Sequence, residues 1–209
     1  MSPAMTVEQA IRSLGRPIFT TKEVASVRSG TVSATTQVLT RMERQGLLLK
    51  VKRNLWCDPA DPRFNRFGLI PYLAGNHRAY LSLLSALNLH GLIDQIPQQV
   101  YAVTTGPTKT VRTEVGVFSF HRIQPEFFDG FDWYGTAKTF LIASPEKALV
   151  DALYLSTRRG TRFRHIPSLD LTQMSDPARI AYWVERIPDP RIRKAVDSRL
   201  EEMGLPLKA

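Results

Sequence analysis

One stretch of the chain combines short hydroxyl side chains, an amide and two arginines, and then continues into alternating apolar and basic residues. It reads SATTQVLTRMERQGLLLKVKRNLW and spans residues 33–56. Hydroxyl and amide groups can bond to base edges in the major groove, whereas Arg and Lys contact phosphates. The segment therefore predicts DNA contacts from these residues: Thr31, Ser33, Thr35, Thr36, Gln37, Thr40, Arg41, Arg44, Lys50, Lys52, Arg53 and Asn54.

A second set of reactive residue types lies in SPEKALVDALY, where Ser144, Glu146, Lys147 and Asp151 share one predicted helix. They could form a cluster that handles phosphate or a metal. The same residues are also explained by helix structure, since Ser caps, Glu favours the first turn and Lys pairs with Asp at i, i+4. We favour the structural interpretation, an amphipathic helix that packs on strands.

Other signals for catalysis or metal binding are weak. The four histidines, His77, His90, His121 and His165, are far apart and have no ligand companions at metal spacing. The sequence contains no nucleophile elbow, phosphate loop or kinase catalytic loop. Cys57 follows a predicted strand and is expected to be a packing residue. We predict no cofactor and no metal, and lean against an enzyme.

An arginine-rich stretch, RRGTRFRH at 158–165, gives two equal alternatives. It could bind nucleic acid or an acidic protein surface, with stacking of its aromatic residue on a base. It could equally be a solvated loop.

Charge is concentrated near the N-terminus of this 209-residue chain. The net charge is +9, and residues 1–60 carry nine Lys or Arg against four Asp or Glu, a net +5. Such a segment favours a polyanionic or acidic partner. No apolar run reaches the roughly 20 residues of a membrane span, no secretory signal is visible, and the single cysteine fits a reducing compartment. We expect a cytoplasmic protein without a membrane partner.

The elements that would position the DNA-contact set are three short helices and a hairpin. Helices are predicted at 6–15, 22–29 and from about 31 to Gln45, with Gly46 as a stop. Residues 47–59 predict strands with one wet face and a tip at 52–54. This order is typical of a winged helix-turn-helix. On the third helix we expect Ala34, Val38 and Met42 to be buried and the contact set, Thr35 included, to face outward.

A Pro/Asp-rich linker places the boundary near 58–63, between a domain at 1–60 and a mixed α/β domain at 61–209. Helices are predicted at 76–92 and 144–160, the latter ended by Gly160. Strands are predicted at 98–105 and 113–123. Two C-terminal helices, each opened by Asp-Pro, carry apolar stripes through Ile180, Trp183, Val184 and Ile187, and through Ile192, Val196, Leu200 and Met203. The predicted fold class is α+β.

Several segments together resemble the AbiEi family of antitoxins, which regulate type IV toxin–antitoxin systems. The similarity covers residues 19–56 and the later segments LSALNLHGLIDQIPQQVYAVTT and FLIASPEKALVDALYL, so it spans about 19–155. It implies a winged helix whose contacting helix and wing correspond to residues 31–44 and 50–54. It also implies a C-terminal antitoxin domain.

The resemblance implies binding to inverted repeats in the protein's own promoter, repression of the operon, and neutralisation of a nucleotidyltransferase-like toxin. The expected state is a monomer or weak dimer, with cooperative DNA binding left open. Two alternative functions remain open. The C-terminal domain could modify the toxin covalently, as an atypical protein kinase would, or the chain could be a plain transcription factor with a ligand-binding or dimerisation domain.

Overall fold

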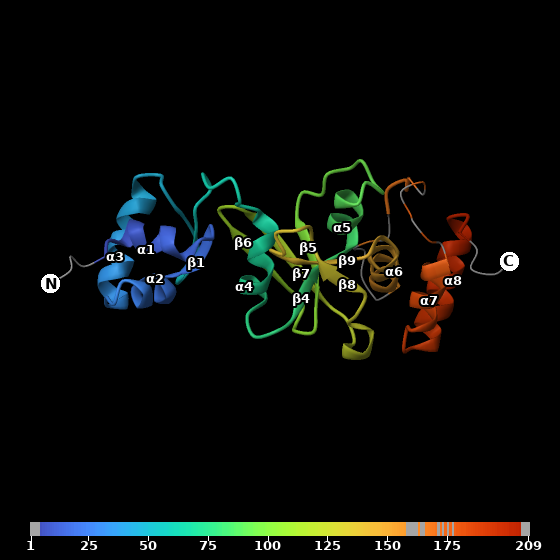
Figure 1. The fold of residues 1–209 in the computed structure, drawn as a ribbon. Helices are drawn as coiled ribbons and strands as arrows, with labels where there is room; N and C mark the ends of the chain where they lie inside the picture. Colours follow the sequence, from blue (N-terminus) through green and yellow to red (C-terminus); the bar gives the residue numbers. More distant parts are fainter. Residues whose placement is uncertain are drawn as a thin grey trace.

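The computed structural model describes residues 5–157, 163, 166–170, 172, 174, 176 and 178–205. Helices gather at one end, a six-stranded sheet occupies the middle, and two helices close the other end (Figure 1). The N-terminal elements are α1 (Val7–Leu14), β1 (Ile18–Thr20), α2 (Thr21–Val27), α3 (Val32–Arg44), β2 (Leu49–Lys52) and β3 (Leu55–Cys57). We call residues 5–57 the N-terminal unit.

The remaining described residues, from 58 on, form the C-terminal unit. Its first elements are a 3-10 turn (Arg66–Leu69), α4 (Ile70–Ala74), β4 (Ala79–Leu81), α5 (Leu83–Leu89), β5 (Val100–Thr104), β6 (Lys109–Thr113) and β7 (Gly116–Arg122). They are followed by a second 3-10 turn (Pro125–Phe127), β8 (Phe131–Trp133), β9 (Leu141–Ala143), α6 (Pro145–Ser156), α7 (Ala178–Glu185) and α8 (Pro190–Glu202). The α+β class is confirmed.

Local sequence signals set the ends of α1 and α3, and the cap Thr6 and the stops Gly15 and Gly46 are as predicted. Thr6 and Gln9 form a reciprocal capping box on α1, and Gly15 ends that helix with φ +65°. Thr31 Oγ1 accepts a bond from the Ala34 backbone N–H at 3.2 Å and so caps α3. Gly46, at φ +74°, provides the left-handed residue after α3. These caps fix where each helix begins and ends without tertiary help.

The small sheet of the N-terminal unit has the order β1-β3-β2, and its central strand β3 is buried on both faces. Phe19 and Trp56 pack with the helices of the N-terminal unit. Their strand neighbours Ile18, Leu55 and Cys57 point the other way, into the large cluster that continues through the C-terminal unit. The prediction of one wet face holds for β2, where Lys50 and Lys52 are exposed, but it is wrong for β3.

The large sheet has the order β6-β7-β5-β4-β9-β8. The pairs β5–β7 and β4–β9 are parallel and the other pairs are antiparallel, so the sheet is mixed. The predicted strands near 98–105 and 113–123 are confirmed as β5 and β7. The helix expected at 76–92 is instead β4 followed by α5. The three residues of β4 are all apolar, and such a short run fits a buried strand or a buried helix equally well. In the structure it is a strand, with Leu81 paired to Ala102 on one side and to Ile142 on the other.

Helix α6 is the centre of the helical layer, in contact with α5, α7 and α8 (Figure 1). Ser144 caps it and Pro145 is its first residue, as predicted, and it ends at Ser156. Ten of its twelve residues are buried, so the amphipathic expectation is wrong: neighbours cover nearly every side. The predicted stop Gly160 and most of the 158–165 stretch lie outside the described residues.

The two C-terminal helices bury the stripes that their periodicity predicts. On α7 and just after it, Ile180, Trp183, Val184 and Ile187 are buried. On α8, Val196 and Leu200 are buried, and Ile192 and Met203 pack against them from partly exposed positions. No described helix is long and apolar enough to cross a membrane.

Candidate nucleic-acid interface

Helix α3 is seated on the N-terminal unit by Thr35, Leu39 and Met42, all of which are buried. This face is rotated from the expected one: Ala34, predicted to be buried, is exposed, while Thr35, predicted to face outward, has no exposed surface. Arg28, at the end of α2, lies against this face, and its Nη1 is 3.5 Å from the Thr35 hydroxyl oxygen. Thr35 is therefore removed from the set of DNA-contact candidates.

The outward face of α3 carries a continuous polar stripe. Ser33, Gln37, Arg41 and Arg44 are exposed, and their spacing of four, four and three residues places them along one side of a helix. Glu43, the only carboxylate of α3, is half-buried. The stripe thus presents a hydroxyl and an amide near the N-terminus and two guanidinium groups near the C-terminus.

The other predicted hydroxyl contacts lie beside this stripe. Thr36 and Thr40 are half-buried, and the Thr36 hydroxyl donates to the Val32 carbonyl at 2.7 Å, so only its acceptor capacity is free. Thr31 is exposed, with its oxygen engaged in the cap described above. These three residues can contribute less to recognition than Ser33 and Gln37.

The β2–β3 hairpin presents two cations near its tip. Lys50 is exposed, with its ammonium 5.4 Å from the centre of the Trp56 ring. Arg53 and Asn54 form the tip, where Asn54 adopts φ +65° as a tight turn requires. Both tip residues are exposed. The hairpin is thereby able to place two positive charges and an amide against a phosphate backbone.

Lys52 is directed to the C-terminal unit instead. Its Nζ donates to the backbone carbonyl of Tyr72 on α4 at 2.5 Å. Burial of the ammonium, and then the nearby charge of Lys109, lower the pKa of Lys52. A phosphate contact by Lys52 would require this bond to break, so we assign it to the junction between the two units.

We expect Lys52→Met to lower the free energy of unfolding by about 0.5–1.5 kcal/mol, because one hydrogen bond across the junction is lost. Urea denaturation of the full chain measures this change. Lys22→Met is the matched control, since Lys22 is an exposed lysine of α2 and its replacement should stay within about 0.5 kcal/mol of the original stability. Equal effects of the two substitutions would contradict the assignment.

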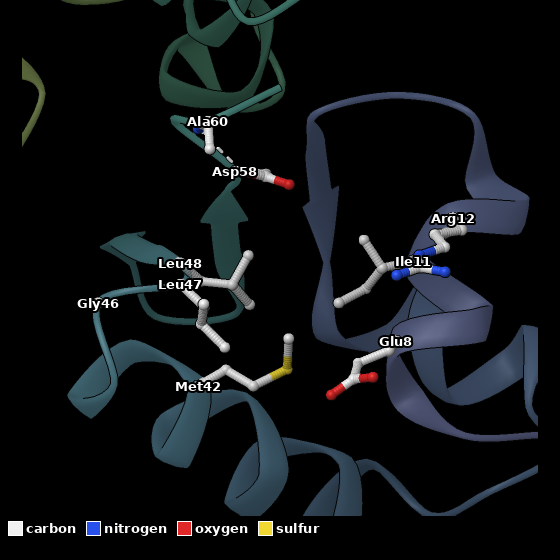
Figure 2. Close-up of a pocket in the computed structure, with 9 residues that line it drawn as sticks. All are labelled: Glu8, Ile11, Arg12, Met42, Gly46, Leu47, Leu48, Asp58 and Ala60. Atoms are coloured by element: carbon white, nitrogen blue, oxygen red, sulfur yellow. Dashed lines mark hydrogen bonds between the residues drawn. The ribbon is translucent and has the colours of Figure 1, made fainter. Parts of the chain in front are cut away.

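A pocket of about 300 Å³ opens on the N-terminal unit, between α1, the C-terminal end of α3 and the residues after β3. Figure 2 shows Ile11, Met42 and Leu48 lining its apolar part, with Glu8 and Arg12 contributed by α1. Because Met42 belongs to the buried face of α3, the pocket lies behind the polar stripe and adds nothing to it.

Three residues of the second candidate cluster, Glu146, Lys147 and Asp151, are buried, and Ser144 is half-buried. Lys147 and Asp151 form an ion pair with no exposed surface. Asp151 Oδ2 also accepts bonds from the Tyr80 hydroxyl at 2.9 Å and the Ser82 hydroxyl at 2.8 Å. Burial lowers the pKa of Lys147 and raises that of Asp151, and in each case the partner's charge opposes the effect of burial.

This geometry supports a structural role for the Lys147–Asp151 pair, in a helix that is buried on nearly every side and not amphipathic. The Lys147 ammonium is enclosed by aromatic rings as well, 3.8 Å from the centre of Phe127 and 5.6 Å from that of Trp183. A substrate could not reach it without unpacking α6. The Lys147–Asp151 pair therefore holds α6 against β4, and neither of its charged groups is accessible.

The remaining reactive residues have packing or hydrogen-bonding roles. Cys57 is buried as expected, and burial, followed by the charge of Asp58, raises the pKa of its thiol to about 11. His90 Nε2 lies 2.8 Å from the Ala143 carbonyl oxygen, and His121 Nε2 lies 2.9 Å from the Ser119 hydroxyl. Among the described residues, no three His, Cys, Asp or Glu side chains are grouped as a metal site would require. His165 is outside the described residues.

In comparisons with known proteins, no family model matches the chain and no curated protein is significantly similar to it.

Proposed function

We propose that the N-terminal unit is a winged helix-turn-helix that binds duplex DNA. In this arrangement α3 enters the major groove and the β2–β3 hairpin is the wing that contacts the neighbouring phosphates. The order of three helices and a hairpin supports this assignment. The single observation that carries it is the exposed stripe of Ser33, Gln37, Arg41 and Arg44 on α3.

The dimensions of the stripe suit a groove. Ser33 and Arg44 are eleven residues apart, which is about 16 Å along a helix at 1.5 Å per residue. A major groove about 12 Å wide admits the first turns of such a helix while its end lies at the phosphate backbone. Ser33 and Gln37 would then meet base edges, and Arg41 and Arg44 would meet phosphates.

Substitutions of Gln37 and Thr35 should have different effects on DNA affinity. We expect Gln37→Ala to weaken operator binding by about 1–3 kcal/mol, or roughly 5- to 150-fold, because an amide contact to a base edge is lost. Thr35→Val should change the affinity less than about twofold, since Thr35 is fully buried. Fluorescence anisotropy with a labelled duplex measures both. A larger loss from Thr35→Val than from Gln37→Ala would contradict the orientation of α3.

We extend the proposal to an autorepressor and antitoxin of a toxin–antitoxin pair that works in the cytoplasm. The segments similar to the AbiEi family support it, and in the fold they correspond to the elements from β1 to β3, to α5 and β5, and to β9 and α6. Its partners would be inverted repeats in its own promoter and a nucleotidyltransferase-like toxin encoded next to it.

A direct test of the DNA proposal compares the duplex upstream of the protein's own gene with a random duplex of equal length. The upstream duplex should bind at least 1,000-fold more tightly, as specific sites do. Equal affinity for the two duplexes would contradict a repressor role. For the antitoxin role, co-expression should restore growth to cells that express the neighbouring toxin, and continued growth arrest would contradict it.

A further inference from the structure

A pocket of about 250 Å³ lies at the junction of the two units, and we call it the junction pocket. Arg16 and Ile18 line it from the N-terminal unit, and Tyr72 and Lys138 line it from the C-terminal unit. Arg63 and Asn65 come from the start of the C-terminal unit, before its first 3-10 turn. A ligand in this pocket would therefore contact both units at once.

The polar groups that line the junction pocket are almost all donors. Arg16, Arg63 and Lys138 carry positive charge and have no acceptor atom. The side-chain oxygen of Asn65 already accepts the Phe67 N–H at 2.9 Å, so its amide nitrogen is the free end. Among the described residues, no carboxylate lines the pocket. A lining of this kind suits an anion.

The carboxylates that neutralise the two arginines lie outside the pocket and are themselves engaged. Asp61 accepts from Arg63 Nε and Nη2 at 2.9 and 2.7 Å, and these side-chain bonds, followed by the bond from the Arg63 backbone, lower its pKa to about 2. Glu23 pairs with Arg16 and also accepts the Thr20 backbone N–H and hydroxyl at the start of α2. Arg63 Nη1 also donates to the Gly15 carbonyl at 2.7 Å. These bonds hold both guanidinium groups in place, and one N–H on each Nη nitrogen of Arg63 remains for a ligand.

Tyr72 adds a further oriented donor. Its hydroxyl oxygen lies 3.4 Å from Arg16 Nη1, which uses the oxygen as an acceptor and leaves the hydroxyl proton available. Burial raises the pKa of Tyr72, so the hydroxyl keeps this proton at neutral pH. Lys138 is exposed at the mouth and has no ion pair to a described carboxylate. It is thus the cation of the pocket that remains to be neutralised.

We propose that the junction pocket binds a small phosphorylated molecule whose phosphate group is held by Arg16, Arg63 and Lys138. A phosphate offers three strong acceptor oxygens, which match a lining of several donors, and its negative charge would meet Lys138, the lining cation without an ion pair to a described carboxylate. The volume is just below the roughly 300–1,000 Å³ of sites for drug-sized ligands, so there is room for the phosphate and a small body. The proposal does not depend on DNA binding.

The test is a calorimetric titration of the full chain with inorganic phosphate at constant ionic strength. The chain should bind one phosphate saturably and more tightly than acetate. Lys138→Gln should weaken phosphate binding about tenfold or more, because a charge-assisted bond is lost. Lys194→Gln, which removes an exposed lysine of α8 with the same change in net charge, should leave it unchanged.

A second variant tests the pocket by adding a negative charge that repels phosphate. Thr139→Glu places a carboxylate at the exposed rim and should abolish phosphate binding. Thermal unfolding without phosphate should be the same for both variants and the original chain. Absence of saturable binding, acetate binding as tight as phosphate, or full affinity in both variants would each overturn the proposal. A short duplex that displaces phosphate and loses affinity to the same extent in Lys138→Gln would overturn it in favour of a DNA-phosphate contact.

Discussion

Replacing Lys147 by methionine is expected to lower the free energy of unfolding by about 3–5 kcal/mol, the range for breaking a buried ion pair. The substitution leaves the Asp151 carboxylate without exposure and with only the Tyr80 and Ser82 hydroxyls as donors. Part of this loss remains even if Asp151 takes up a proton, because its packing and hydrogen bonds were formed around an ammonium. Chemical denaturation of the full chain measures the effect.

The double replacement of Lys147 by Met and Asp151 by Leu tests whether the loss of stability in Lys147→Met comes from an unpaired buried charge. It removes both charges, so the cost of an unpaired buried charge disappears, and we expect it to recover at least half of the stability lost in Lys147→Met. Lys194→Met is the matched control for loss of a lysine and should change stability by less than about 0.5 kcal/mol. If Lys147→Met lowered the free energy of unfolding no more than Lys194→Met does, this would contradict the burial of the Lys147–Asp151 pair.

Replacing Arg41 and Arg44 together by alanine is expected to weaken binding to the upstream duplex by about 100-fold at moderate salt. Each arginine is exposed on α3 and forms no ion pair with a described carboxylate, so it is available for a phosphate. A charge-assisted hydrogen bond is worth about 1.5–3 kcal/mol, and the lower end of this range for two contacts, about 3 kcal/mol, corresponds to a loss of slightly more than 100-fold. Fluorescence anisotropy with the upstream duplex measures the change.

A matched pair of substitutions separates position from charge. Arg112 and Arg191 are exposed arginines of β6 and α8, and their joint replacement by alanine makes the same change in net charge away from the proposed interface. It should weaken binding less than about threefold, through long-range attraction alone. If the two double variants lose affinity equally, α3 is not the contacting helix.

The sequence predicts the local parts of this fold well. Capping residues such as Thr6 and Ser144 mark helix starts, because a cap acts over three residues and needs no partner elsewhere. The apolar stripe of α7 is similarly readable from its period. Most elements that the sequence leaves out or misassigns, such as β4 and β9, are short apolar runs, which fit a strand or a helix until their neighbours are known.

The candidate site is predicted less fully, and the reasons are physical. Neighbouring residues of a helix point about 100° apart, so a small rotation exchanges Ala34 and Thr35 between the outer and inner faces. The rotation is fixed by contacts with α1 and α2 that the α3 sequence does not contain. The local sequence makes Lys52 look like a phosphate contact. Its actual partner, the Tyr72 carbonyl, lies 20 positions away along the chain and is not visible in that local pattern.

The burial of the Lys147–Asp151 pair in the C-terminal unit also depends on residues that are distant in the sequence. The i, i+4 spacing of Lys147 and Asp151 predicts their contact, but it favours a solvated helix face. Tyr80 and Ser82, which accompany the pair, are about 70 positions away and lie on or just after a strand that was expected to be helical. No signal within α6 indicates that its charged residues are enclosed.

The salt dependence of binding between the full chain and its upstream duplex shows directly whether α3 and the hairpin contact phosphates. Arg41, Arg44, Lys50 and Arg53 provide about four phosphate contacts, which predicts a slope of about −3.6 for log K against log salt concentration per bound chain. The Arg41/Arg44 double variant should reduce this slope to about −1.8. A slope near zero, or one that the double variant leaves unchanged, would contradict DNA binding by α3 and the hairpin.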